Sequence, residues 1–254
     1  MTEEKKRINK IHTFGLLGRN ISYSFSSGYF SEKFDYLQLV NYEYKNFDIN
    51  SMSQFSDLIS ENSIQGMNVT IPYKEEVIPY LDEIDQEASE IGAVNTIKFS
   101  ESGTTKGYNT DVYGFENSLK PLLESHHKKA LILGTGGASK AVAYALRKLN
   151  IEYQFVSRNP ASDEQISYAE LNESIILNNT LLINCTPLGT FPETKLCADI
   201  PYQFITSKHL LYDLIYNPSV TAFLNKGKEK GAKTKNGLEM LQLQAEKSWQ
   251  IWNH

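Results

Sequence analysis

Apolar and polar residues alternate in the segment GMNVTIPYK, from Gly66 to Lys74. Val69 and Ile71 are β-branched and are separated by a polar residue, which is the period of two expected for a strand with one buried face. Pro72 has no N–H to donate and keeps the residue before it extended, so the strand should end there. Lys74 then follows a strand end, where open α/β sheets bind ligands. On this segment alone, a solvated lysine after a turn is the simpler interpretation.

Comparable patterns predict alternating strands and helices in both halves of the chain. Apolar runs or period-two alternation indicate strands, and apolar residues spaced by three and four indicate helices. Because strands that alternate with helices form sheets covered by helices, we expect an α/β fold with mostly parallel sheets. The predicted strands are 13–18, 37–44, 66–71, 92–97, 130–133, 152–156, 181–184 and 210–215. The predicted helices are 29–34, 51–61, 77–81, a run ending at 91, 115–123, 140–149, 221–230 and 238–253.

Length and charge limit the functions open to this chain. Its 254 residues suffice for one large or two ordinary domains, and 41% hydrophobic with 22% charged residues is typical of globular proteins. The net charge is −5 at pH 7 without a long basic run, so we expect neither nucleic acid nor a membrane surface as a partner. The charged start lacks the apolar run of a signal peptide, and no stretch has the length of a membrane span.

The cysteines and histidines indicate a reducing compartment and no metal site. Cys185 and Cys197 are the only two cysteines, too few for a disulfide framework, so we expect a cytoplasmic protein. The five histidines are scattered, without cysteines or carboxylates at metal-ligand spacing, so we expect no bound metal. The sequence leaves the oligomeric state open between monomer and homodimer.

A glycine-rich turn, GTGGAS, follows the apolar strand at 130–133 and leads into a predicted helix. Strand, glycine turn and helix in this order are the context of a dinucleotide-binding fingerprint. Gly134 permits the tight turn, and Gly136 lets backbone N–H groups approach a pyrophosphate at the helix N-terminus. The third small position is Ser139 instead of glycine. The pattern predicts nucleotide binding.

The end of the next strand indicates which dinucleotide is bound. Enzymes that use NAD usually have an acidic residue there, hydrogen-bonded to the ribose 2′-hydroxyl. In this chain the strand ends in Ser157-Arg158-Asn159, and a guanidinium favours a 2′-phosphate. The alternative is a surface arginine after a strand, but the position of Arg158 favours NADP.

Polar residues gather at the edges of predicted elements in the first half. Four serines at 22–27 precede an aromatic helix-like run, where they can cap the helix or bind a carboxylated or hydroxylated ligand. Asp111 stands where a helix N-cap is expected, with Asn95 and Asn109 shortly before it. Helix capping accounts for each of the serines and for Asp111 separately. Taken together with Asn95 and Asn109, these polar residues also fit the wall of a polar pocket.

Taken in order, these segments resemble the shikimate dehydrogenase family over nearly the whole chain. Each segment alone has modest specificity, but nine in the same order are highly specific. The resemblance implies a reversible, NADP-dependent reduction of 3-dehydroshikimate to shikimate, a step of aromatic amino-acid (chorismate) biosynthesis. The segments are YSFS, NVTIPYK, GAVNT, GYNTD, GTGGAS, VSRN, NCTPLG, DLIY-P and NGLEMLQLQA.

The resemblance also implies two domains and a role for individual residues. An N-terminal α/β substrate domain at 1–115 would be completed by the C-terminal helix 237–254, and a Rossmann-type, doubly wound NADP domain would span 116–236. Lys74 matches the catalytic lysine, and Ser24 and Ser26 match the pair that holds the substrate carboxylate. The other substrate positions fall on Thr70, Asn95, Asp111, Tyr216 and Gln244. The cofactor positions fall on Gly134, Thr135, Gly136, Gly137, Ala138, Ser157, Arg158, Asn159, Leu214 and Gly237.

The implied chemistry suits Lys74 and Asp111 as a proton-handling dyad. Hydride arriving at a carbonyl carbon leaves an alkoxide, which a nearby ammonium group can stabilise and protonate. A carboxylate beside the ammonium would orient it. Burial lowers the pKa of a lysine whereas a neighbouring aspartate raises it, and the sequence leaves the balance open.

The chain departs from the family pattern at three places. Ser27 and Tyr29-Phe30-Ser31 replace a proline and a histidine-asparagine pair, so the helix after the serines could sit differently. Ser157 replaces the usual asparagine before the arginine, without a second basic residue after Asn159, so NADP preference could be weaker. Leu214 replaces the usual methionine beside the nicotinamide, an apolar exchange that should be tolerated.

Two other functions compete with this interpretation. One is a broader quinate/shikimate dehydrogenase that uses NAD or NADP. The other is a non-catalytic binding or regulatory protein of the same fold, which predicts that Lys74 or Asp111 is altered. Both residues are present.

Overall fold

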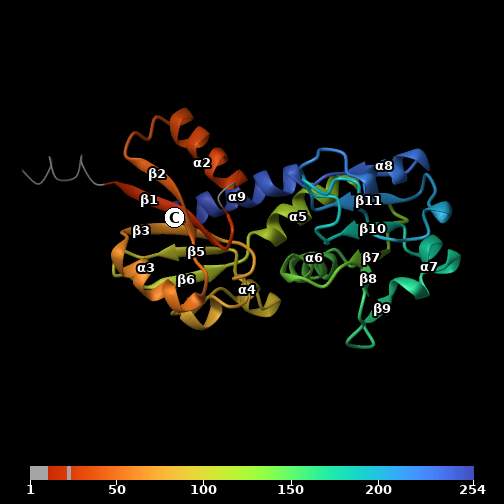
Figure 1. The fold of residues 1–254 in the computed structure, drawn as a ribbon, viewed down its shortest axis with the longest axis horizontal. Coiled ribbons are helices and arrows are strands. Elements are labelled where there is room, and N and C mark those ends of the chain that lie inside the picture. Colours follow the sequence, from red (N-terminus) through yellow and green to blue (C-terminus); the bar gives the residue numbers. More distant parts are fainter. Residues whose placement is uncertain (1–10, 22–23) are drawn as a thin grey trace, which may run out of the picture. The chain divides into compact units, whose positions relative to one another are not determined.

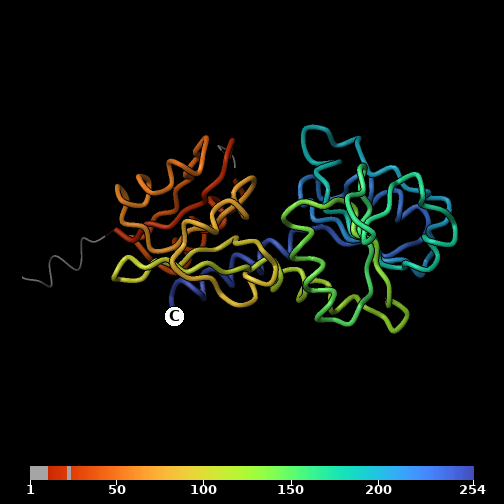
Figure 2. Tube along the Cα trace, turned by 90° about the horizontal axis from the view of Figure 1, so that it is seen from below, coloured from red at the N-terminus to blue at the C-terminus, as the bar shows by residue number. Residues whose placement is uncertain are grey.

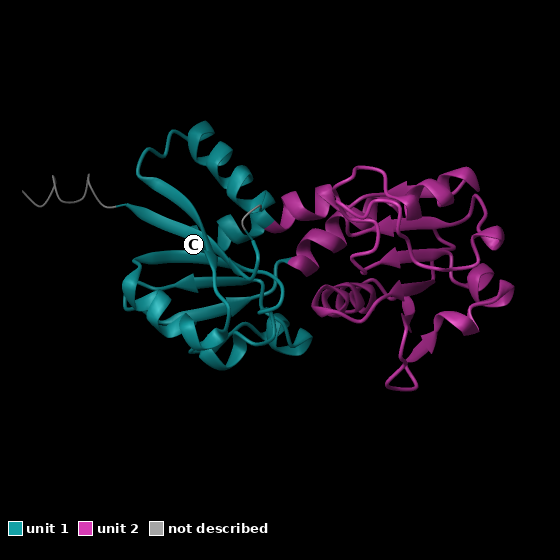
Figure 3. Cartoon of the chain, in the orientation of Figure 1, with its two compact units in different colours: residues 1–110, 245–254 teal, residues 111–244 magenta. Residues whose placement is uncertain are grey.

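The computed structural model describes residues 11–21 and 24–254 and divides the chain into two compact units. Unit 1 comprises 1–110 and 245–254, and unit 2 comprises 111–244 (Figure 3). These borders lie a few residues from the domain limits expected at 115 and 236. The charged start of the chain and Ser22 lie outside the described residues.

Unit 1 is built on a mixed sheet of six described strands in the order β2-β1-β3-β5-β6-β4 (Figure 1). β1 runs parallel to β2 and β3, and β4 runs parallel to β6. β5 is antiparallel to both of its neighbours, β3 and β6, and the turn at Gly103 (φ 88°) returns the chain directly from β5 into β6. The strands are β1 (His12–Gly18), β2 (Tyr42–Asp48), β3 (Ile64–Val69), β4 (Glu83–Ile84), β5 (Thr96–Phe99) and β6 (Thr105–Tyr108). The helices that belong entirely to this unit include α2 (Phe25–Tyr36), α3 (Phe55–Glu61) and α4 (Gln86–Ile91).

Both faces of this sheet are covered by apolar side chains. On one face, Phe30 and Phe34 of α2 pack with Trp252 from the end of α9 (Leu238–Asn253). The chain therefore ends within unit 1 (Figure 2). On the other face, Phe55 of α3 packs with Met67 of β3. Burial of such large side chains on two faces is the main stabilising contribution to a three-layer arrangement.

Unit 2 is built on a second sheet of six described strands, all parallel, in the order β12-β11-β10-β7-β8-β9. The order reverses at β7, which is the doubly wound arrangement of dinucleotide-binding domains. The strands are β7 (Lys129–Leu133), β8 (Glu152–Ser157), β9 (Gln165–Ser167), β10 (Leu181–Asn184), β11 (Leu210–Asp213) and β12 (Lys233–Lys235). The helices are α5 (Asp111–Leu119), α6 (Gly137–Lys148), α7 (Glu173–Asn178), α8 (Ala222–Glu229) and the first part of α9.

Helices cover both faces of the parallel sheet, as its apolar strands require. Phe223 of α8 and Ile176 of α7 belong to one cluster with Leu182 and Leu211 from the centre of the sheet. Tyr212, the next residue of β11, points to the other face, where its ring meets Phe115 of α5 edge-on at 5.0 Å between centroids. The continuous apolar runs of β7, β10 and β11 predicted this two-sided burial.

Three predicted elements are placed differently in the structure. The strand expected at 37–44 begins only at Tyr42, because α2 ends in a turn with Gln38 at φ 56°, which leaves Leu37 and Val40 exposed. The helix expected at 77–81 is a single 3-10 turn, since Pro79 cannot donate a helical hydrogen bond. The strand expected from Gly92 begins at Thr96, because Gly92 at φ 71° ends α4 in the left-handed conformation.

Three helices begin earlier than the pattern predicted, and one of them is α2, which begins at Phe25 instead of 29. α5 begins at Asp111 instead of 115, so that residue is the first residue of the helix and not its N-cap. α6 begins at Gly137 instead of 140. Short elements without a clear period were missed, namely β4, β6, β9, β12 and α7. The strands at 13–18, 152–156 and 181–184 and the helices at 221–230 and 238–253 agree with the structure within about two residues, the usual scatter of element ends.

Candidate active site

The turn after β3 brings Thr70, Lys74 and Asn95 together in unit 1. Thr70 follows the last residue of β3, Val69, whose N–H donates to Asn95 O at 2.8 Å. The Lys74 carbonyl accepts from Val94 N at 2.7 Å. These backbone bonds fix the segment of Lys74 against the segment of Asn95. The Lys74 side chain is partly buried.

Hydrogen bonds determine the direction of the Asn95 side chain, which is 2% exposed. Its Oδ1 accepts from Thr110 N (2.7 Å), Thr110 Oγ1 (3.1 Å) and Thr96 Oγ1 (3.1 Å). Since these donors occupy the oxygen, the NH₂ end must point the other way. A fixed amide donor of this kind suits a hydroxyl or carbonyl oxygen of a ligand.

The two expected carboxylate-binding serines stand at the start of α2. Ser24 is the N-cap, and its Oγ accepts from Ser27 N (3.2 Å) and donates to Asn46 Oδ1 on β2 (3.2 Å). Ser26 is 8% exposed and lies beside the Tyr44 hydroxyl. Burial raises the pKa of Tyr44 well above its ordinary value, so its hydroxyl remains a neutral donor. Tyr44 and Asn46 are two residues apart on β2, so their side chains lie on the same face of the strand, where they contact Ser26 and Ser24.

A buried chain of hydrogen bonds continues from Tyr44 to the C-terminal helix. The Tyr44 hydroxyl donates to Asn68 Oδ1 (2.9 Å), and Asn68 Nδ2 donates to Ser248 Oγ of α9 (2.9 Å) and Thr96 Oγ1 (3.2 Å). Thr96 in turn donates to Asn95. The environment of Ser26 is therefore connected to that of Asn95 within unit 1.

The departures in α2 are accommodated by aromatic packing. The Phe30 ring stacks on Tyr44 at 4.7 Å between centroids and packs against Trp252 at 5.2 Å. The Tyr29 hydroxyl donates to Glu246 of α9. Residues that differ from the family pattern thus tie α2 to β2 and α9, and the N-cap at Ser24 is retained.

The glycine-rich turn lies at the carboxyl edge of the parallel sheet in unit 2. Gly134 follows β7 at φ 100°, a conformation that favours glycine, and a Cβ there would lie 3.0 Å from Thr186 Cγ2. Gly136 occupies the N-cap position of α6 without a side-chain cap, and a Cβ there would meet nothing within 4 Å. Gly137 and Ala138 form the first turn of α6, and Thr135 is exposed. The arrangement leaves space for a pyrophosphate beside the helix N-terminus.

Arg158 extends from the neighbouring strand end. Ser157 closes a tight turn, because its Oγ accepts from Asn159 N (3.2 Å) and donates to Asn159 O (3.1 Å). The Arg158 side chain is exposed next to Tyr168. Burial raises the pKa of Tyr168 and the guanidinium of Arg158 opposes that shift, which places a positive charge at this edge of the sheet.

The residues expected beside the nicotinamide also meet at this edge. Gly237 N donates to Ile215 O at 3.0 Å, and a Cβ on Gly237 would lie 2.0 Å from Leu214 O, so only glycine fits. Tyr216 follows two residues after Leu214 and is partly buried. The structure therefore brings Leu214 and Gly237 into contact and places Tyr216 on the same loop.

Asp111 and Gln244 come from helices that pack together in unit 2. Gly114 of α5 lies so close to α9 that a Cβ would stand 2.4 Å from Met240 O and 3.2 Å from Gln244 Cβ. Asp111 is one helical turn before Gly114 and 7% exposed, and Gln244 is 6% exposed. Both are buried polar side chains, which soluble proteins keep only with partners or for function.

Several supporting residues were missed from the sequence. Asn46 was missed because the strand was placed at 37–44, and the polar alternation of Tyr44 and Asn46 within β2 was the available signal. Ser248 lies inside an apolar helix period, where a single serine carries no signal of its own. Among the described residues, no group of three or more His, Cys, Asp or Glu side chains could hold a metal ion. Within the same residues, none of the helices combines the length and the apolar character that crossing a membrane requires.

Comparison with known proteins gives a consistent family. Residues 16–97 match the family model described as shikimate dehydrogenase substrate binding domain. A curated NADP(+) shikimate dehydrogenase of Methanosphaera stadtmanae is 34% identical over 94% of this chain and 90% of its own. The chain belongs to the shikimate dehydrogenase family. It is an α/β protein with a Rossmann-type nucleotide domain, as the sequence predicted.

Solved structures of the family share this fold. The shikimate dehydrogenase of Aquifex aeolicus has a TM-score of 0.85 and 35% identity, covering 96% of this chain and 92% of its own. A quinate dehydrogenase of Corynebacterium glutamicum in complex with NAD also has a TM-score of 0.85, at 25% identity, covering 96% and 94%. Since a shikimate dehydrogenase and a quinate dehydrogenase have the same TM-score against this chain, the fold alone does not select the substrate.

Proposed function

We propose that this chain catalyses the reversible, NADP-linked reduction of 3-dehydroshikimate to shikimate in chorismate biosynthesis. The observation that carries this proposal is the whole-length similarity to curated NADP(+) shikimate dehydrogenases, at 34–37% identity over 94–97% of the chain. The partner is a small molecule. The alternative enzyme is a broader quinate/shikimate dehydrogenase that uses NAD or NADP. It would accept a second cofactor at the edge near Arg158 and a second substrate at the serines of α2.

The described residues fit the binding of NADP. The open N-terminus of α6 at Gly136 offers backbone N–H groups to a pyrophosphate, and the exposed Arg158 offers a guanidinium to a 2′-phosphate. Leu214 and Gly237 would line the nicotinamide, which supplies or accepts the hydride when bound. The remaining proposed cofactor contacts are Gly134, Thr135, Gly137, Ala138, Ser157 and Asn159.

Substrate binding is assigned mainly to unit 1. The Ser24 and Ser26 hydroxyls would hold the carboxylate, and Thr70 and Asn95 would bind ring hydroxyls, with Tyr216 and Gln244 completing the set. Ser24 and Ser26 can act as donors because a hydroxyl rotates to suit its acceptor. We accordingly propose unit 1 as the substrate domain and unit 2 as the NADP domain, with borders at 110 and 244.

Lys74 and Asp111 are proposed to handle the proton. The Lys74 ammonium would stabilise the alkoxide oxygen as it forms and protonate it, and in the oxidation direction the amine would accept the hydroxyl proton. Asp111 would orient the ammonium and hydrogen-bond the same hydroxyl. Asp111 is the first residue of α5.

The test measures NADP⁺ reduction by absorbance with shikimate, and then with quinate and with NAD⁺. We expect turnover with shikimate and NADP⁺, and a loss of about 10²–10⁴-fold in kcat for Lys74→Ala with the Kd of NADP⁺ unchanged. Lys106→Ala removes a lysine of the same sheet that is paired with Glu83 at 3.2 Å, and it should leave kcat unchanged.

Comparable rates with quinate or NAD⁺ would instead support the broader enzyme. An absence of turnover with every pair would contradict catalysis and leave a binding protein of the same fold. A Lys74→Ala variant with full activity would contradict the assignment of the proton donor alone.

Two further properties remain proposals. Both cysteines are free, which is usual in the reducing cytoplasm, where we place the protein. We propose a monomer or a homodimer in solution. Sedimentation equilibrium distinguishes the two, and a larger assembly would contradict both.

A further inference from the structure

Asp213 is a buried carboxylate that the proposed mechanism does not use. It is the last residue of β11, at the carboxyl edge of the parallel sheet, and it is fully buried. Its Oδ1 accepts from Asn184 Nδ2 and from Ile215 N, both at 3.0 Å, and its Oδ2 accepts from Thr221 Oγ1 at 2.5 Å. A carboxylate is kept in such a place only when several donors compensate for its burial.

Each donor begins a different segment at the carboxyl edge of the parallel sheet, where the cofactor is proposed to bind (the cofactor edge). Asn184 ends β10 and uses its own Oδ1 to accept from Thr186 N (3.1 Å) and Thr186 Oγ1 (2.7 Å), which shapes the loop 185–190. Ile215 lies between Leu214 and Tyr216. Thr221 is the N-cap of α8 and accepts from Leu224 N. One side chain therefore holds the loop after β10, the loop after β11 and the start of α8.

The same segments make close contacts with the glycines of this edge. Thr186 Cγ2 is the atom nearest to a Cβ on Gly134, at 3.0 Å, and a Cβ on Gly189 would lie 2.9 Å from Leu196 O and 3.6 Å from Thr221 Cβ. Gly237 is pressed against Leu214 O. Because these contacts leave little or no room for a Cβ on the glycines, a displacement of one loop would be transmitted directly to the next.

We propose that Asp213 is a positioning residue that holds the loop 185–190 and Leu214 in the arrangement needed by the nicotinamide half of NADP. This inference rests on the proposed function. Asp213 is buried, and its oxygens accept hydrogen bonds from Asn184, Ile215 and Thr221. It therefore acts through these three residues and does not contact the ligand. Arg158, at the other strand end, shares none of these hydrogen bonds.

The test compares two ligands that occupy different parts of the edge, NADP⁺ and 2′,5′-ADP, by titration calorimetry. Asp213→Ala leaves three buried donors without an acceptor, so the loops should shift and the Kd of NADP⁺ should rise about tenfold or more. The Kd of 2′,5′-ADP, which has no nicotinamide, should change by less than about twofold. The kcat with saturating NADP⁺ should fall as well, because the hydride acceptor is less well placed.

Conservative variants separate positioning from folding. In Asp213→Asn the Oδ1 acceptor for Asn184 and Ile215 remains and only the hydrogen bond with Thr221 must reverse, so the Kd of NADP⁺ should rise much less than in Asp213→Ala. Tyr212→Phe is the matched control, because it removes a buried hydrogen bond from the neighbouring residue of β11, to Ser118 at 2.6 Å, and should change neither Kd. If Asp213→Ala does not fold, Thr221→Val serves instead, because it removes one of the three hydrogen bonds and should raise the Kd of NADP⁺ several-fold.

The outcomes separate this inference from the proposed function. A raised Kd of NADP⁺ with an unchanged Kd of 2′,5′-ADP in Asp213→Ala, together with recovery of NADP⁺ binding in Asp213→Asn, would support it. An equal rise in the Kd of both ligands, or an unchanged Kd of NADP⁺ in a folded Asp213→Ala or Thr221→Val variant, would overturn it and leave the proposal of NADP binding by the unaltered chain unaffected. An unaltered chain that binds neither ligand would overturn the NADP proposal and this inference with it.

Discussion

Ser24 combines two tasks in a single hydroxyl, one structural and one proposed for the substrate. As N-cap of α2, its Oγ accepts from Ser27 N, and the same group is proposed to bind the substrate carboxylate. The sequence suggested both uses as alternatives. The structure establishes the cap, and the two uses are compatible because Ser24 Oγ can keep accepting from Ser27 N while its proton turns from Asn46 Oδ1 to the substrate carboxylate.

Substitutions at Ser24 should separate the cap from substrate binding. Ser24→Ala should lower the free energy of unfolding by about 1 kcal/mol and raise the KM for shikimate. Ser24→Asp restores the cap but brings a negative charge to the carboxylate site, so stability should recover while KM rises further. Urea unfolding and steady-state kinetics measure the two effects.

Ser51→Ala provides the control for this pair. Ser51 caps the 3-10 turn before α3 by accepting from Ser53 N, away from α2, so its loss should affect stability alone. A Ser24→Asp variant with normal KM would contradict the proposed carboxylate contact.

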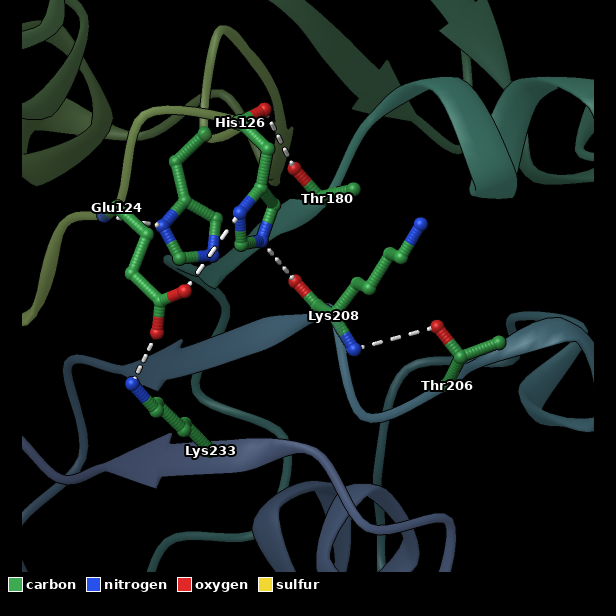
Figure 4. A network of polar contacts seen from close by, with 7 residues as sticks. Glu124, His126, Thr180, Thr206, Lys208 and Lys233 are labelled. Atoms are coloured by element: carbon green, nitrogen blue, oxygen red, sulfur yellow. Dashed lines mark hydrogen bonds and ion pairs between the residues drawn. The ribbon is translucent and has the colours of Figure 1, made fainter.

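At the scale of elements, the loop between α5 and β7 holds a polar network at the amino edge of the sheet in unit 2 (Figure 4). His126 Nε2 lies 2.9 Å from Lys208 O, and Glu124 forms an ion pair with Lys233 of β12. His127 is 3% exposed, and its Nδ1 accepts from Glu124 N at 2.9 Å. Within the described part of the chain, the buried His127 Nε2 has no hydrogen-bond partner.

His127 should make the stability of unit 2 depend on pH. Burial, reinforced by the adjacent His126 ring, lowers the pKa of His127 below its ordinary value of 6.5. The unfolded chain then binds a proton below pH 6.5 while the folded chain remains neutral there. The stabilisation is complete above pH 6.5 and is lost as pH falls below it, by at most about 1.4 kcal/mol per pH unit for one group.

The measurement compares urea unfolding at pH 8 and pH 5.5 for the unaltered chain and His127→Gln. The glutamine carbonyl can still accept from Glu124 N, so the variant should lose less stability on acidification. His209 is a second buried histidine with a lowered pKa and the same sign, so some dependence should remain. An identical pH dependence in both chains would show that His127 does not titrate in this range.

At the scale of the whole molecule, each sheet has its own core, and the proposed cofactor contacts belong to unit 2. A ligand that binds only the folded state stabilises it by RT ln(1 + [L]/Kd), about 2.7 kcal/mol at one hundred times Kd. NADP⁺ should therefore raise the unfolding temperature more than NAD⁺ does, because Arg158 can pair with the 2′-phosphate.

Arg158→Ala should bring the stabilisation by NADP⁺ down to the level of NAD⁺ in differential scanning calorimetry. Arg147→Ala is the matched control, since Arg147 lies at the end of α6 and donates to the Tyr153 hydroxyl at 2.9 Å. If Arg158→Ala still prefers NADP⁺, other residues of this edge select the cofactor.

The sequence by itself determined what depends on short-range order. The period of two in β3, the apolar runs of β7, β10 and β11, and the glycine turn after β7 each report a local conformation or the burial of one face, so the fold class and the nucleotide edge followed from them. The predictions of a strand at 37–44, a helix at 77–81 and a strand starting at Gly92 were wrong, because left-handed residues and Pro79 redirect the chain within a few residues.

Only the tertiary structure decided which distant polar groups meet. Asn46 contacts Ser24, Ser248 contacts Asn68, and Asn184 contacts Asp213, although whole elements separate the two members of each pair along the chain. The sequence pattern around a polar residue does not identify its hydrogen-bond partner. Once packing buries both groups, the free-energy cost of leaving either one unpaired fixes their geometry. The direction of the Asn95 amide and the inward carboxylate of Asp213 are consequences of that rule.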